Sequence, residues 1–121
     1  MDQTGRVDVS LTRFEMLVAD ALDAIPDDLA VHMENVAVFV EDQGYSPNLL
    51  GLYEGIPLTE RTPLNYGGMI MPDRITIYRR PILVRCRTEA DVVRQVLITV
   101  IHEVGHHFGM DDDRLHELGW A

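Results

Sequence analysis

The sequence has no lysine, a single cysteine and no long hydrophobic run. Its ten positive charges are all arginine, and twenty acidic residues bring the formal net charge to −10. Nucleic acids and anionic membranes require a basic surface, so neither is expected as a partner. The lone cysteine, Cys86, excludes an internal disulfide and is typical of a reducing compartment. We therefore expect a cytoplasmic protein.

Targeting and membrane-spanning segments are also missing from the sequence pattern. The first ten residues contain no basic region followed by an apolar stretch, so no signal peptide is predicted. The apolar stretch VVRQVLITVI is short and is interrupted by Arg94 and Gln95, so it does not predict a transmembrane helix. The length of 121 residues fits one domain with its own hydrophobic core, spanning residues 1–121.

Hydrophobic patterning predicts an α+β domain with a small mixed sheet of three or four strands. A helical stripe follows Ser10 as N-cap and ends before Pro26, and a short helical turn follows it. Three strands are predicted: a buried one at 35–42, an edge strand at 49–58 and a third at 74–84 that ends near Pro81. We expect the third strand to lie between the other two, with the second antiparallel at the border of a cleft.

The segment 88–108 predicts a long helix near the centre of the domain. Thr88 and Asp91 have the spacing of a capping box, and Gly109 supplies a left-handed C-terminal cap. One stripe of this helix is apolar: Val93, Leu97, Val100/Ile101, Val104 and Phe108. A second stripe is polar: Asp91, Gln95, Thr99, His102 and His106. A polar stripe on a buried helix needs partners, and a metal-lined cleft would provide them.

The helix ends in the pattern H-E-x-x-H, formed by His102, Glu103 and His106. Two histidines one helical turn apart can offer two imidazole nitrogens to a single ion, and this pattern is typical of zinc metalloproteases. Zinc lowers the pKa of a bound water to about 7 and polarises a carbonyl group. Glu103 is placed to act as the general base.

A catalytic zinc ion requires a third protein ligand and one open position. In the extended pattern H-E-x-x-H-x-x-G-x-x-(H/D), this ligand is the third residue after the glycine, which here is Asp112. The neighbours Asp111 and Asp113 are competing candidates. The alternative interpretation of the whole motif is an ordinary helix that happens to carry histidines.

Four stretches of the sequence resemble the small bacterial zincin-like metallopeptidases, also called mini-zincins. They read VAVFVED, LLGLYEGIPLTER, MPDRITIYRRPI and HEVGHHFGMDDDRLHELGW. The resemblance implies a zincin-like fold with an N-terminal helix, a small twisted sheet, an active-site helix and a short C-terminal helix. It also implies His102, His106 and Asp112 as zinc ligands and Glu103 as base.

Two further residues are candidates for positions around the site. Larger zincins have a methionine turn below the metal, but little chain follows Asp112, so Trp120 is the candidate for an apolar floor. The alternative is that Trp120 only closes the core. His107 is a candidate for contacting substrate or orienting Glu103, with a role at the helix end as the alternative. Surface arginines are the usual partners of acids, although a carboxylate-binding role for one arginine of the segment 74–94 stays open.

The sequence therefore predicts a zinc-dependent metallopeptidase acting on a peptide or protein, with the peptide added to the edge strand. A non-catalytic peptide-binding module with a vestigial or structural metal site is the first alternative. A metal-dependent nuclease is the second, disfavoured because Glu103 replaces the glycine of H-G-x-x-H and because the chain is acidic. A homodimer is left open.

Overall fold

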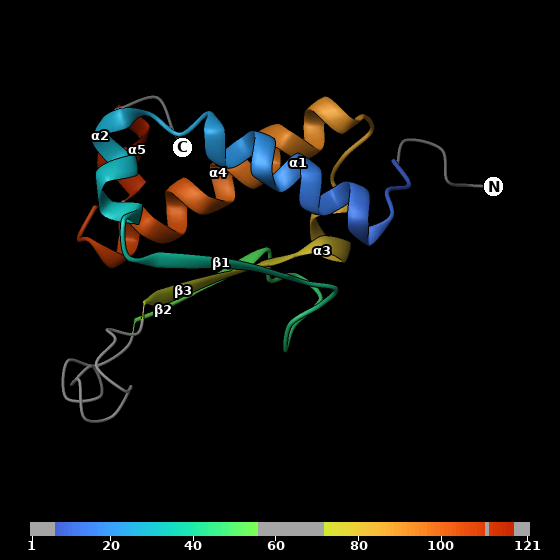
Figure 1. Ribbon diagram of the computed structural model, residues 1–121, viewed down its shortest axis with the longest axis horizontal. Helices are drawn as coiled ribbons and strands as arrows, with labels where there is room; N and C mark the ends of the chain where they lie inside the picture. Colours follow the sequence, from blue (N-terminus) through green and yellow to red (C-terminus); the bar gives the residue numbers. More distant parts are fainter. Residues whose placement is uncertain (1–6, 56–71, 111, 118–121) are drawn as a thin grey trace.

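The computed structural model describes residues 7–55, 72–110 and 112–117, apart from the side chains of Asp112 and Leu115. Figure 1 shows the arrangement of the elements. The helices are α1 (Leu11–Asp23), α2 (Asp27–Ala30), the 3-10 turn η1 (Val31–Met33), α3 (Arg79–Leu83), α4 (Glu89–His107) and α5 (Asp112–Glu117). The strands are β1 (Val36–Glu41), β2 (Gly51–Glu54) and β3 (Asp73–Tyr78).

The strands form one mixed sheet in the order β1-β3-β2. β1 pairs with β3 in parallel, and β2 pairs with β3 in antiparallel register, with Tyr53 opposite Ile75. This order and the edge position of β2 confirm the α+β fold and the predicted strand arrangement. The prediction that 35–42 is a buried strand was wrong, because β1 is an edge strand and its Phe39 side chain is 45% exposed.

The third strand is shorter than the sequence pattern predicted. It ends at Tyr78, and the next residues form α3 instead of continuing to Pro81. Pro81 is the third residue of this helix, within the first turn, where backbone N–H groups have no partner inside the helix. A proline is therefore tolerated at this position. Pro81 disfavours the interior of a strand but is compatible with the first turn of a helix.

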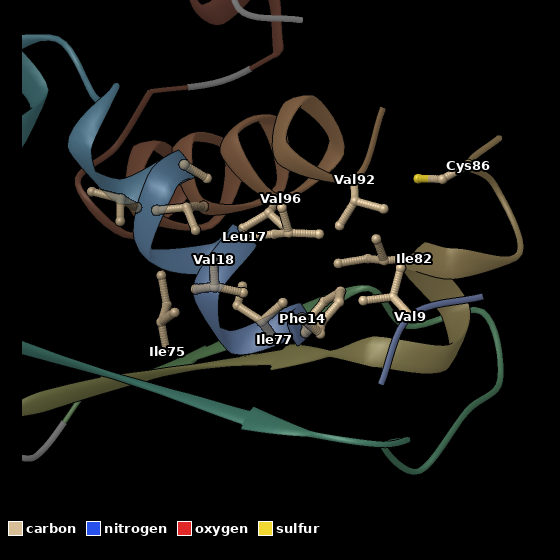
Figure 2. Packing of buried hydrophobic residues seen from close by; sticks show 13 residues of the cluster. Val9, Phe14, Leu17, Val18, Ile75, Ile77, Ile82, Cys86, Val92 and Val96 are labelled. Atoms are coloured by element: carbon tan, nitrogen blue, oxygen red, sulfur yellow. The ribbon is translucent and has the colours of Figure 1, made fainter. Parts of the chain in front are cut away.

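The core lies between the sheet and a layer formed by α1 and α4, which pack against each other (Figure 1). Figure 2 shows the side chains of α1, α4 and β3 meeting in this layer. The fully buried members include Phe14, Ile75, Ile77, Val92 and Val96. On α4, Val92 and Val96 are buried in place of the predicted Val93 and Leu97, which pack at the margin of the core.

The predicted helix ends are observed. The Ser10 hydroxyl accepts a hydrogen bond from the Arg13 N–H, and Thr88 and Asp91 form a reciprocal capping box at the start of α4. Capping of this kind supplies partners to N–H groups that a helix cannot satisfy internally. Within the described parts of the chain, no helix combines the length and apolar character needed to cross a membrane.

Candidate functional site

The polar stripe of α4 lies along a groove. Gln95, Thr99, His102 and Glu103 line one side of a hollow of about 310 Å³, and the segment 48–51 at the start of β2 lines the other. Thr99 is buried and its hydroxyl donates to the Gln95 carbonyl at 2.8 Å. Three residues of the predicted polar stripe, Gln95, Thr99 and His102, thus border a groove next to the antiparallel edge strand, whereas Asp91 and His106 do not line it.

Gly51 allows β2 to approach α4 closely at this groove. A Cβ atom at position 51 would lie 2.7 Å from the Thr99 Cγ2 atom and 3.3 Å from the Thr76 carbonyl oxygen. A Cβ contact of 2.7 Å is essentially never observed, so the strand or the Thr99 side chain would have to move. A residue without a side chain therefore determines the width of the groove beside His102 and Glu103.

His102 and His106 lie on neighbouring turns of α4, with their ring centroids 5.8 Å apart. The His102 ring is partly buried, and its Nε2 atom is completely buried without a hydrogen-bond partner among the described residues. Leaving a buried polar atom unpaired is energetically costly, and such atoms usually have a partner. A nitrogen of this kind, one turn from a second imidazole, fits a metal ligand.

Glu103 is half-buried between α4 and β2. Its Oε1 atom accepts a hydrogen bond from the backbone N–H of Tyr53 at 3.2 Å. Burial raises the pKa of the Glu103 carboxyl, while the Tyr53 N–H and the imidazoles of His106 and His102 lower it in part. A backbone donor of the edge strand therefore holds the carboxylate of Glu103, the residue next to His102 on α4.

Tyr53 also connects the site to two residues at its margin. Its hydroxyl donates to Asp73 Oδ2 at 2.7 Å, and its ring stacks on the His107 ring with a centroid distance of 4.0 Å. His107 Nε2 lies 3.8 Å from Asp73 Oδ2. Gly55 leaves room for this arrangement, because a Cβ atom there would lie 3.0 Å from the His107 ring. His107 is thus packed on the residue whose N–H holds Glu103.

Gly109 forms the left-handed cap that was predicted for the end of α4. Gly109 has a φ of 88°, the Gly109 N–H donates to the His106 carbonyl, and the Met110 N–H donates to the Gly105 carbonyl. These two bonds form a Schellman motif. α5 then begins at Asp112, five positions after His107, the last residue of α4.

The predicted third ligand and the predicted floor residue remain untested by the geometry. The side chain of Asp112 lies outside the described residues, as do Asp111 and Trp120. Asp113 is described and is exposed on α5. The described side chains alone do not bring three His, Cys, Asp or Glu residues together around one point. Two imidazoles on neighbouring turns, one with a buried nitrogen that has no partner among the described residues, fit two ligand positions of a metal ion.

Tyr53 and Asp73 were not predicted as parts of the site. Asp73 is 9% exposed, at the start of the mostly buried central strand. A carboxylate at such a position indicates a polar partner, which was the available signal. The sequence could not indicate Tyr53, because its hydrogen bond to Glu103 is donated by the backbone N–H and not by the side chain.

Three comparisons with known proteins complement this geometry. The sequence matches the model of the zincin-like metallopeptidase family over residues 27–120. The fold is similar to that of a conserved hypothetical protein from Thermus thermophilus, with a TM-score of 0.51, 23% identity, and coverage of 82% of this chain and 94% of that chain. None of the curated proteins matches the sequence significantly. The matched range contains every described element from α2 to α5, and the chain belongs to the zincin-like metallopeptidase family.

Proposed function

We propose that this protein is a zinc-dependent peptidase in which His102, His106 and Asp112 hold the ion. The observation that carries the proposal is the buried Nε2 atom of His102, which has no hydrogen-bond partner among the described residues; His102 and Glu103 line the same groove. Family membership supports this assignment. When bound, zinc would activate water and polarise the scissile carbonyl.

The residues of the chain supply the proton transfers and the position of the substrate. Glu103 takes a proton from the attacking water and passes it to the leaving amine nitrogen. The Tyr53 N–H keeps the carboxylate in place during both transfers. An extended peptide lies along the outer side of β2, where backbone pairing orients it without requiring a particular sequence.

Peptide hydrolysis by zinc-loaded protein tests this function. The wild-type chain should cleave members of a mixed peptide library, and Glu103→Gln should retain zinc but lose cleavage, because the amide has nearly the same shape but cannot accept the proton. His116→Ala, which changes an exposed histidine on α5, is the matched control and should cleave normally. A zinc-loaded wild type that binds peptides without cleaving any would instead be a binding module.

A further inference from the structure

A second hollow adjoins the groove at the N-terminal part of α4. It measures about 330 Å³, and three arginines line it: Arg85 and Arg87 from the segment before α4, and Arg94 from α4 itself. Gln95 and Ile98 line both this hollow and the groove that contains His102 and Glu103. The arginine hollow is thus a continuation of the candidate active-site groove.

The distribution of ion pairs distinguishes these three arginines from the others. Eight of the ten arginines lie in the described ranges. Five of the eight form ion pairs: Arg13 with Glu89, Arg74 with Glu54, Arg79 and Arg80 with Asp42, and Arg114 with Glu117. The other three have no ion pair with any described acid, and they are the three that line the hollow. This is unexpected in a chain with twice as many acidic as basic residues.

Local contacts leave the guanidinium groups available. Asp91 is the acid in this hollow, and its Oδ2 atom accepts from the backbone N–H groups of Arg87 and Thr88 at 2.9 and 3.3 Å. Its carboxylate is thereby used as a helix cap. The Arg85 Nη1 atom donates to the Pro81 carbonyl at 2.9 Å, which fixes this side chain at the rim. Fixing an arginine in advance lowers the entropy lost when it binds an anion.

We propose that the arginine hollow is a subsite for a carboxylate group of the substrate, so that the enzyme selects acidic peptides. The inference rests on the proposed peptidase function. Arginine pairs with carboxylates through two parallel hydrogen bonds, and three such groups around one hollow match the negative charge of an acidic peptide. The carboxylate belongs to an aspartate or glutamate side chain or to the C-terminus of the peptide.

The helix determines how far this carboxylate lies from the cleaved bond. Arg94 precedes His102 by eight residues on α4, which corresponds to about 12 Å at a rise of 1.5 Å per residue. An extended peptide advances about 3.3 Å per residue. The carboxylate should therefore lie roughly four residues from the scissile bond.

The net charge of the protein bears on the proposed preference for acidic peptides. A net charge of −10 repels acidic peptides at long range, so their binding must come from positive charge at the site itself. Exposed charges are screened over about 10 Å at 0.1 M salt. Preference for an acidic peptide should therefore weaken as salt is added, whereas binding of a neutral peptide should change little.

Peptide binding and cleavage measured on the full chain test the proposal. One glutamate is moved stepwise through an otherwise neutral fluorescent peptide, with glutamine at the same position as reference, and each peptide is made with a free or an amidated C-terminus. Binding is followed by anisotropy, and cleavage sites by mass spectrometry. The variants are Arg94→Gln and Arg87→Gln, with Arg80→Gln as the control because Arg80 does not line the hollow. Thermal melting verifies that each variant is folded.

The wild type and Arg80→Gln should bind the best-placed glutamate peptide roughly threefold to tenfold more tightly than its glutamine counterpart, and the two hollow variants should lose this preference. Tighter binding of the free-acid peptides than of the amidated peptides, with no glutamate preference in either set, would identify the C-terminal carboxylate as the group that binds. An equal preference in all variants, or displacement by equimolar inorganic phosphate, would overturn the assignment. Arginine-dependent preference without any cleavage would refute the peptidase function while supporting the carboxylate subsite.

Discussion

The backbone N–H of Tyr53 on β2 donates a hydrogen bond to the Glu103 carboxylate on α4, with 3.2 Å between nitrogen and oxygen. The two residues are separated by fifty positions in the sequence. A backbone N–H group of the edge strand β2 therefore holds Glu103, the proposed general base. The groove, the strand that borders it and the carboxylate that would accept a proton form one connected unit.

Removing the Glu103 side-chain oxygen should lower the free energy of unfolding more than replacing the carboxylate by an amide of nearly the same shape. Glu103→Ala leaves the Tyr53 N–H without the Glu103 oxygen, and we expect it to lower the free energy of unfolding by about 1–2 kcal/mol. Glu103→Gln keeps a side-chain carbonyl oxygen at this position and should cost less. Chemical denaturation of both variants checks this, and equal losses would show that the hydrogen bond contributes nothing.

The hydroxyl of Tyr53 provides a second test of the same unit. Tyr53→Phe removes the donor that Asp73 accepts at 2.7 Å while keeping the ring that stacks on His107. A hydrogen bond to a carboxylate contributes about 1.5–3 kcal/mol, so the variant should be destabilised within that range. In an Asp73→Asn background, Tyr53→Phe should cost clearly less. Additive losses in the double variant would contradict a direct coupling.

The close approach of β2 to α4 predicts an unusual response to a small side chain. Gly51→Ala would normally be harmless in a strand, but its Cβ would meet the Thr99 Cγ2 atom at 2.7 Å. We expect a loss of about 1–3 kcal/mol, as is typical of overpacking. Thr99→Ser removes this methyl and keeps the hydroxyl, so Gly51→Ala should cost less in that background. The same loss in both backgrounds would argue against the contact.

Local sequence patterns were sufficient to predict α4 and its ends. The Thr88–Asp91 capping box and the Gly109 reversal depend on residues within a few positions of each other. The period of the polar residues also placed Gln95, Thr99 and His102 on one groove. Features that a single element determines by itself could therefore be predicted.

Individual side-chain contacts between distant segments were not predicted, although the strand order was. The Tyr53–Glu103 and Tyr53–Asp73 hydrogen bonds join separate elements, and no short motif encodes them. The end of β3 at Tyr78 was missed because Pro81 is compatible with both a strand edge and a first helical turn. That Arg94 forms no ion pair with a described acid also depends on where the acids lie in the fold, which the sequence pattern does not indicate. The roles of Asp112 and Trp120 stay predictions.

The buried thiol of Cys86 should make the free energy of unfolding vary with pH in the alkaline range. Burial raises its pKa from 9.0 to about 11. The native state then keeps its proton where the unfolded chain has lost it, so this contribution is complete below about pH 9 and is lost as the pH rises toward 11. The free energy of unfolding of the wild type should fall more steeply in this window than that of Cys86→Ala. Parallel curves would contradict the assignment.

Zinc content tests the central claim most directly. Wild-type protein purified without chelator or histidine tag should contain about one zinc per chain, tetrahedral with one open position for water. His102→Ala and His106→Ala should lose most of this zinc, whereas His116→Ala should retain it, because His116 is an exposed residue on α5. Zinc that remains near one per chain in His102→Ala and His106→Ala, or that disappears only in His116→Ala, would contradict the account.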